Sequence, residues 1–449
     1  MKSNRTRKTS VITRRQFLKG SAVAATGTAL LGPTIVPSSV FGAEAPSNRI
    51  TIGCIGVGRQ GTADMRDFLG LPSAQIIAVC DVDARRLANA KKTVEAHYAK
   101  QSSGGAYKGC KTYGDFRELV AQADIDAVSI VTPDHWHTLS AIAAAKAGKD
   151  IFLEKPLTLT IEEGRVLSDT VRRYNRVFQV GSQQRSDTRF RQACELVRNS
   201  RAGKIHTVKV GFGTDPATGA EPPMPVPDVL NYEMWLGPAP WVPYTENRVH
   251  PQADYGRPGW LRIADYGAGM ITGWGAHHND IAQWGLGTEY TGPVEIEGQA
   301  EYPKDGLWDV HGPFRIEYTY ANGVKVICAD SQKNKDGITF EGDAGWVFVT
   351  RGRIDAEPKS LLTSTIGPNE TRLYKSNNHK ANFLDCIKSR AETIAPVEVA
   401  HRSCTVCLLG EIAMRLGRKL KWEPDKERFI GDEQANRMLA RTMRSPWRL

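Results

Sequence analysis

Apolar residues in the first part of the chain occur in short runs that alternate with stretches of helical spacing. The continuous apolar runs predict buried strands over 50–55, 75–80, 127–131 and 150–153. Helical spacing between them predicts helices over 116–123 and 137–147. Strands that alternate with helices are typical of βαβ units and a parallel sheet. We therefore expect an α/β fold that begins with a parallel sheet covered by helices.

The second half of the chain shows a different pattern. It predicts strands over 314–320, 324–329 and 346–351, and helices over 188–199, 380–389 and 399–416. Between 215 and 260 the periodicity is lost, and the stretch is rich in Pro, Trp and Tyr. A long excursion of this kind inside an α/β domain is more often functional than idle. It is interpreted either as an aromatic wall of a glycoside pocket or as a loop that covers the sheet or a neighbouring subunit.

The first 43 residues have the character of a targeting segment rather than of folded structure. They hold seven basic residues and no acidic one, and Arg14-Arg15 precedes a mildly apolar stretch over 20–31. The segment resembles a twin-arginine (Tat) signal, which implies export to the periplasm of a protein folded beforehand in the cytoplasm. Cleavage is expected after Ala43 or Ala45. The alternative is an uncleaved membrane anchor, which the short apolar stretch disfavours.

Charge and composition narrow the classes of function. The chain carries 59 Lys and Arg against 49 Asp and Glu, but residues 44–449 have a net charge of only +3. This balance gives no electrostatic support to a nucleic-acid partner. No apolar run after residue 43 reaches the ~18 residues that a membrane span requires. The eight cysteines, including the pair Cys404 and Cys407, are interpreted as small buried apolar residues, and no metal site is predicted.

A glycine-rich loop follows the first predicted strand and opens a helix. It consists of Gly56, Val57, Gly58, Arg59, Gln60 and Gly61. Glycines in this pattern allow a tight turn and a close approach of the backbone to a pyrophosphate. Asp81 ends the second strand, where a carboxylate accepts hydrogen bonds from ribose hydroxyls and repels a 2′-phosphate. The sequence therefore predicts an NAD site and disfavours NADP, although Arg85 or Arg86 can soften that preference.

Two further strand ends carry polar side chains. The strand over 127–131 is followed by Thr132 and Pro133, with His135 and His137 just beyond, and the strand over 150–153 is followed by Glu154 and Lys155. The carboxyl ends of parallel strands face the ligand crevice of such a sheet. We therefore expect these six residues to lie near the cofactor.

These motifs together resemble the Gfo/Idh/MocA oxidoreductases. The matching pieces are the glycine loop at 56–61, the stretch 132–137, Glu154-Lys155-Pro156, and the stretch 267–280. The resemblance implies a Rossmann domain over 48–185 and, over 186–449, an α/β domain with a large open, mostly antiparallel sheet. It also implies action on carbohydrates or cyclitols with NAD(P), and a homo-oligomer such as a dimer or tetramer.

The resemblance also assigns roles to individual residues. Lys155 matches the family's catalytic lysine, Pro156 follows a peptide bond that is usually cis, and His277 matches the histidine that binds the reacting sugar. Gly273 departs from the pattern, because sugar dehydrogenases commonly have an Asp there. Asp280 matches the family's carboxylate three residues after that histidine. Independently of the resemblance, the further candidate substrate contacts are Arg185, Trp274, His278 and His311.

The sequence thus predicts an exported NAD-dependent oxidoreductase that acts on a sugar, glycoside or cyclitol by hydride transfer. Because free NAD is not sustained outside the cytoplasm, the cofactor is expected to be tightly bound and recycled. One alternative is an NAD-dependent glycosidase, which oxidises and re-reduces its substrate around an elimination. The other is a non-catalytic protein that binds sugar and dinucleotide.

Overall fold

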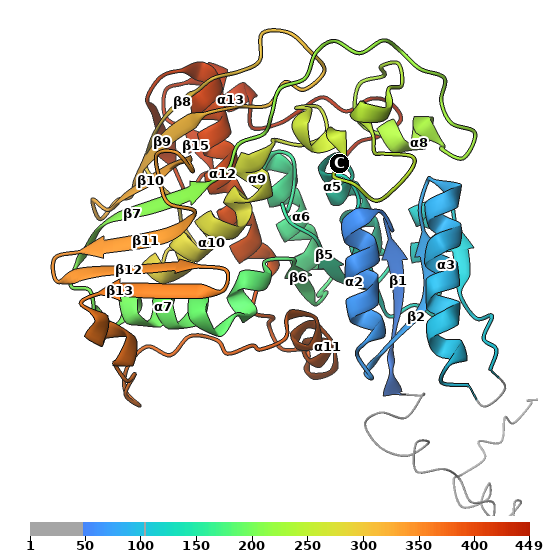
Figure 1. Cartoon of the computed structure of the whole chain (residues 1–449), viewed down its shortest axis with the longest axis horizontal. Coiled ribbons are helices and arrows are strands. Elements are labelled where there is room, and N and C mark those ends of the chain that lie inside the picture. The colour runs from blue at the N-terminus through green and yellow to red at the C-terminus, as the bar shows by residue number, and fades with distance from the viewer. Residues whose placement is uncertain (1–47, 103–104) are drawn as a thin grey trace, which may run out of the picture. The chain divides into compact units, whose positions relative to one another are not determined.

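The structure is a computed structural model, which describes residues 48–102 and 105–449 (Figure 1). Its first sheet has six parallel strands in the order β3-β2-β1-β4-β5-β6. The strand order reverses between β1 and β4, because β2 and β3 lie on one side of β1 and β4 to β6 lie on the other. The strands are β1 (Ile50–Ile55), β2 (Ala74–Cys80), β3 (Lys111–Tyr113), β4 (Ala127–Ile130), β5 (Asp150–Leu153) and β6 (Phe178–Val180). The predicted Rossmann sheet is confirmed. Ligands of such sheets bind where the strand order reverses, outside the carboxyl ends of the strands.

The helices between these strands begin where the sequence supplies caps. They are α2 (Arg59–Leu69), α3 (Ala84–Ala99), α4 (Phe116–Val120), α5 (Asp134–Lys146) and α6 (Ile161–Arg173). Asp83 caps α3 by accepting hydrogen bonds from two backbone N–H groups, and Thr160 and Glu163 form a capping box at α6. Helix α5 begins at Asp134, three residues before its predicted start, and Pro133 precedes its first residue.

The second sheet has nine strands in the order β13-β12-β11-β7-β10-β9-β8-β14-β15. All neighbours are antiparallel except β7 and β10, which confirms the open, mostly antiparallel sheet. The strands are β7 (Ile205–Phe212), β8 (Glu295–Ala300), β9 (Phe314–Thr319), β10 (Lys325–Asp330), β11 (Gly337–Gly342), β12 (Gly345–Thr350), β13 (Arg353–Glu357), β14 (Leu420–Glu423) and β15 (Arg428–Phe429).

The helices of the second half are α7 (Thr188–Arg198), α8 (Tyr232–Leu236), α9 (Met270–Gly273), α10 (Gly275–Leu286), α11 (His379–Ser389), α12 (Val397–Leu416) and α13 (Glu433–Arg437). Of these, α7, α10 and α12 pack against the second sheet (Figure 1). Helix α12 contacts both β8 and α6, and it is apolar on most sides because it lies between the two sheets. No helix in the described part of the chain has the length and apolar character needed to cross a membrane.

Helix α11 returns to the Rossmann sheet although it follows the second sheet in the chain. Its Phe383 packs edge-on against Phe68 of α2 and Phe152 of β5, with ring centroids 6.5 and 5.9 Å apart. Helix α11 therefore completes the Rossmann core, although the predicted domain boundary at residue 185 places it in the second domain.

The excursion rich in Pro, Trp and Tyr folds onto the Rossmann domain. Leu230, Tyr232, Trp235, Tyr244 and Tyr266 form a small apolar core of its own. A β-bridge joins Leu230 to Asp83, and the N–H of Ala84 donates to the Val229 carbonyl. Most of these aromatic rings thus stabilise the excursion rather than line a pocket.

The eight cysteines are free and buried. They lie in the core among apolar side chains, as their interpretation as small apolar residues predicts.

A buried ion pair joins the edge of the Rossmann sheet to α10. Arg185 follows β6, and its Nε and Nη2 donate to the two carboxylate oxygens of Asp280 at 2.7 and 2.8 Å. Their side chains are 4% and 2% exposed. Ser403 of α12 donates to the same carboxylate at 2.7 Å, and the Arg185 guanidinium lies over the Trp284 ring. Bidentate geometry and a third donor offset the cost of burying both charges.

Asp280→Asn is expected to lower the free energy of unfolding by about 3–5 kcal/mol, because it leaves the Arg185 charge buried without a partner. Denaturant unfolding measures this change. Asp124→Asn is the matched control, since Asp124 pairs with Lys111 at an exposed site and its loss is expected to cost less than about 1 kcal/mol. Equal effects of the two substitutions would contradict the structural role of the buried pair.

Candidate active site

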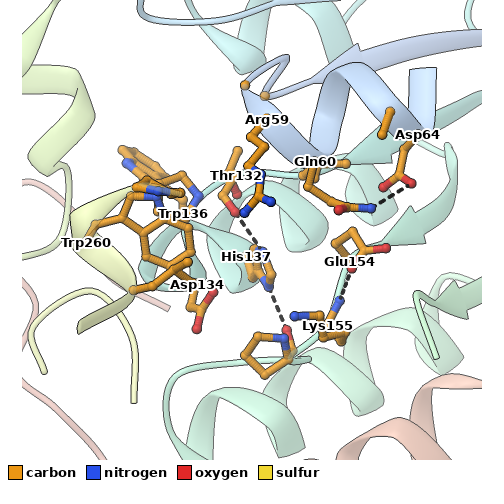
Figure 2. Close-up of a pocket in the computed structure, with 18 of the residues that line it drawn as sticks. Arg59, Gln60, Asp64, Thr132, Asp134, Trp136, His137, Glu154, Lys155 and Trp260 are labelled. Atoms are coloured by element: carbon orange, nitrogen blue, oxygen red, sulfur yellow. Dashed lines mark hydrogen bonds between the residues drawn. The ribbon is translucent and has the colours of Figure 1, made fainter. Parts of the chain in front are cut away.

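A cavity of about 1000 Å³ lies along the carboxyl ends of β1, β2, β4 and β5. The Rossmann domain contributes the glycine loop and the residues after each of these strands. The opposite wall comes from the second half of the chain and includes Trp260, Trp274, His277, Arg351 and Lys380. Figure 2 shows the Rossmann side of this cavity together with Trp260. Both halves of the chain are therefore needed to build the site.

The glycine loop has the geometry that its sequence predicts. Gly56 has φ +80°, and a Cβ added there would lie 2.5 Å from the Val131 carbonyl oxygen. A Cβ at Gly61 would lie 1.9 Å from the Gly56 oxygen, so only glycine lets α2 approach β1 this closely. Gly58 faces open space, where an added Cβ would meet only Arg86 Nη1 at 3.5 Å. The loop thus leaves backbone free for a pyrophosphate, and these residues fit a dinucleotide.

Asp81 fixes the loop from the end of β2. Its Oδ2 accepts a hydrogen bond from the Val57 N–H at 2.8 Å, and its Oδ1 accepts one from the Asp83 N–H at 2.9 Å. The side chain of Asp81 also lines the cavity, whereas Val57 is buried behind the loop. A carboxylate has about four lone-pair positions, so Asp81 keeps acceptor capacity for ribose hydroxyls.

Arg86 is held by the excursion. Its Nη2 donates to the carbonyls of Pro251 and Asp254 at 2.9 and 3.2 Å, and its guanidinium lies 4.6 Å from the centroid of the Tyr255 ring. His250 Nε2 lies 3.0 Å from Asp83 Oδ2. We call residues 246–260 the return segment. It crosses from the second half of the chain to the start of α3 and closes the cavity on the β2 side.

His137 braces the ends of β4 and β5. Its Nδ1 lies 2.7 Å from the Pro156 carbonyl oxygen, and its Nε2 lies 3.0 Å from that of Thr132 (Figure 2). Burial lowers the pKa of His137 to about 4. Thr132, Pro133 and His137 line the cavity. His135 instead points away from it, with Nε2 3.0 Å from the Trp235 carbonyl.

Glu154 and Lys155 follow β5 inside the cavity. Gln183 donates to Glu154 Oε1 at 2.6 Å, and the Lys155 backbone N–H donates to Oε2 at 3.1 Å. A Cβ at Gly181 would lie 2.3 Å from Oε1, so this carboxyl is tightly enclosed. Burial, strengthened by the negative Asp64, raises the pKa of Glu154 to about 8. The Lys155–Pro156 peptide bond is cis, and the Lys155 amine has no hydrogen-bond or ion-pair partner among the described residues.

His277 faces the cavity from the first turn of α10. Its side chain is buried, and its Nδ1 has no hydrogen-bond partner in the described chain. Burial lowers the pKa of His277 well below its ordinary value, and the positive charges of Lys155 and Arg351 act in the same direction. The imidazole is therefore neutral near pH 7. The Trp274 ring lies beside it, with centroids 5.8 Å apart.

Four other residues expected to contact substrate do not line the cavity. Arg185 and Asp280 form the buried ion pair described above. His278 points to the Gly211 carbonyl at 3.0 Å, and His311 Nε2 accepts a hydrogen bond from the Ile271 N–H at 3.1 Å. These side chains brace the elements that carry Trp274 and His277.

Lys380 and Asp134 are among the cavity groups that were not assigned from the sequence. Lys380 of α11 donates to Asp64 and Asp67 of α2, both at 2.8 Å, and lies near Glu154. Only the tertiary fold brings these residues together. Asp134 begins α5, is 4% exposed, lines the cavity and has no side-chain partner among the described residues. Burial raises its pKa to about 8, partly opposed by Lys155. Its place at a helix start after β4 was the available signal.

The chain matches models of known protein families. Residues 216–449 match the model of the oxidoreductase family's C-terminal alpha/beta domain, which covers more than half of the chain. The chain belongs to the Gfo/Idh/MocA oxidoreductase family. Residues 50–182 match the family's NAD-binding Rossmann fold. Residues 11–30 match the TAT (twin-arginine translocation) pathway signal sequence, and they lie outside the described residues.

The curated relatives include proteins of glycosyl hydrolase family 109. Glycosyl hydrolase family 109 protein 2 of Shewanella sp. (strain ANA-3) is 37% identical over 169 residues, which are 35% of this chain and 36% of that protein. The chain therefore spans about a third of the length of the curated relatives it matches.

Solved structures of the Gfo/Idh/MocA fold cover most of the chain. Myo-inositol 2-dehydrogenase from Lactobacillus plantarum has a TM-score of 0.59 at 18% identity, over 84% of this chain and 100% of its own. The WlbA dehydrogenase from Bordetella pertussis, solved in complex with NADH and UDP-GlcNAcA, has a TM-score of 0.61 at 16% identity, over 84% and 99%. At such identities these structures show the shared fold.

Asp134→Asn is expected to change how stability depends on pH. The unfolded chain loses this proton near pH 4, whereas the folded protein keeps it until about pH 8, so this group's stabilisation is lost as the pH rises through that window. Relative to wild type, the variant should gain about 1 kcal/mol per pH unit between pH 5 and 7.5, measured by urea unfolding. Asp124→Asn, at an exposed site, is the control. A pH-independent difference would show that Asp134 is ionised.

Proposed function

We propose that this protein is an exported, NAD-dependent oxidoreductase that oxidises or reduces a carbinol carbon of a sugar, glycoside or cyclitol. One observation carries the proposal. The Lys155 amine and the His277 imidazole, from different halves of the chain, line one cavity beside the glycine loop, and neither has a side-chain hydrogen-bond partner among the described residues. Unengaged polar groups in a largely buried site are characteristic of residues that act on a ligand.

The reaction requires both a hydride carrier and a group that accepts a proton. Bound NAD supplies the acceptor or donor of a hydride. Loss of a hydride from a carbinol carbon also requires that the hydroxyl proton be accepted nearby. Lys155 can hold that proton because it stands at the end of β5 on the cavity floor. His277 is neutral and lines the same cavity, so its imidazole can accept a hydrogen bond or a proton from the same sugar.

The same geometry supports NAD over NADP. Asp81 places a carboxylate at the end of β2, where a 2′-phosphate would meet negative charge. Arg85 and Arg86, the cations best placed to attract that phosphate, donate instead to backbone carbonyls of the return segment. Their donors are thus partly used within the protein.

The return segment also supports a retained cofactor. It closes the cavity on the β2 side through Arg86, Tyr255 and the His250–Asp83 contact. A twin-arginine signal carries proteins that have already folded, and free NAD is not maintained outside the cytoplasm. An enzyme closed around NAD before export can turn over only if a second substrate or a later step restores the cofactor. We therefore propose a redox-neutral net reaction.

An NAD-dependent glycosidase is the second candidate. The similarity to glycosyl hydrolase family 109 proteins favours it, and so does Asp134. Cleavage of a glycosidic bond requires that the leaving oxygen receive a proton. Asp134 keeps its proton near pH 7 and is unpartnered in the cavity. Release of free sugar from an aryl glycoside without net NADH would establish this activity.

Lys155→Ala and His277→Ala are expected to lower the rate of hydride transfer by about 10²–10⁴, the usual worth of a proton-transfer group. Bound NAD should remain, because neither side chain supports the glycine loop. The assay follows absorbance of reduced nicotinamide when NAD-loaded protein meets a panel of glucose, glucuronate, myo-inositol and methyl glucoside.

Lys146→Ala, which removes an exposed lysine at the end of α5, is the matched control and should keep wild-type rates. A rate of hydride transfer close to that of the wild type in His277→Ala would contradict the role assigned to His277. Absence of hydride exchange with every sugar that binds would instead favour a non-catalytic binding protein.

A further inference from the structure

Arg351 lines the cavity from the second sheet and has no anionic partner. It follows β12 at the turn into β13, and its guanidinium lies 4.6 Å from the centroid of the Trp274 ring. It makes no hydrogen bond and no ion pair with any described residue. Stacking on an indole orients the planar guanidinium and leaves its five N–H donors free. Trp274 in turn lies beside His277, so this free cation borders the reacting end of the cavity.

The wall next to Trp274 leaves room for a substrate group. A Cβ added at Gly273 would meet no atom closer than Met270 Sδ at 3.9 Å, and Gly273 lines the cavity. The absence of a side chain there opens space beside the Arg351–Trp274 stack. A sugar substituent that reaches this space can approach the guanidinium without displacing protein atoms.

No described acidic group around the cavity forms an ion pair with Arg351, although the charges of Glu154 and Asp187 act on it. Asp187 accepts a hydrogen bond from the Arg189 N–H at 2.7 Å and lies near the Arg189 guanidinium. Asp64 and Asp67 share Lys380, and Asp81 accepts two backbone N–H groups. Burial raises the pKa of both Asp134 and Glu154 to about 8, so these two carboxyls are mostly uncharged near pH 7. Arg351 therefore has no ion-pair partner among the described residues at this end of the cavity.

We propose that the substrate is an acidic sugar, a uronate or aldonate, whose carboxylate is bound by Arg351 in the space left by Gly273. This inference rests on the proposed carbohydrate activity and names its substrate class. A planar guanidinium matches a planar carboxylate through two parallel hydrogen bonds. A single guanidinium fork matches the one charge of a carboxylate better than the two of a phosphate monoester, which commonly recruits several donors.

The test compares matched sugars on NAD-loaded protein. Isothermal titration calorimetry gives Kd for glucuronate, glucose and glucose 6-phosphate, and absorbance of reduced nicotinamide gives kcat/KM for the same three. We expect glucuronate to bind at least about 10-fold more tightly than glucose. Arg351→Gln should reduce this preference by about 10-fold or more. Arg353→Gln, which removes an exposed arginine two residues on that pairs with Asp355, should keep the wild-type preference.

Gly273→Asp provides a second, opposite test. It places a carboxylate in the open space, so it should weaken glucuronate binding more than glucose binding. Equal binding of glucuronate and glucose, or a preference that Arg351→Gln leaves intact, would overturn the inference while hydride transfer from glucose would still support the proposed function. Selective binding of glucose 6-phosphate would also overturn it. Arg351-dependent binding of glucuronate without hydride transfer would uphold the charge recognition and contradict the proposed activity.

Discussion

The site depends on the second half of the chain being held against the carboxyl edge of the Rossmann sheet. Buried ion pairs secure this contact at Arg185–Asp280 and at Lys380–Asp64, and the return segment adds the contacts of Arg86. A pair that is buried, bidentate and further hydrogen-bonded tolerates little displacement, because separation would leave a charge without solvent or partner. His277 and Lys155 face one cavity only while these contacts persist. The buried ion pairs thus fix the positions from which Lys155 and His277 act.

Local sequence patterns predicted the parts of the fold that local forces determine. The Rossmann strands, the glycine loop and Asp81 could be read from spacing because they follow one another within a βαβ unit. Lys155 and His277 came from motifs of the family resemblance. Strands β7, β8 and β11 were not predicted individually, since they are partly exposed. Pairing across the sheet, rather than local propensity, decides their existence.

Contacts between distant segments account for what the sequence did not reveal. Helix α11 brings Lys380 to Asp64, more than 300 residues earlier in the chain, and the turn after β12 brings Arg351 to Trp274. No spacing rule predicts such encounters. The same limit explains why His135, His278 and His311 were expected near ligands. Their motifs place them close to the site, but the direction of each side chain depends on backbone groups from elements far along the chain.

We propose that the folded protein carries its own NAD out of the cytoplasm. The most direct measurement is to purify the exported protein without added nucleotide, denature it, and quantify the dinucleotide released per chain. A form lacking residues 1–43, kept in the cytoplasm, is the matched control. If NAD is retained, both forms should release close to one NAD(H) per chain and little NADP(H). An exported protein that is empty and binds NAD weakly and reversibly would contradict it.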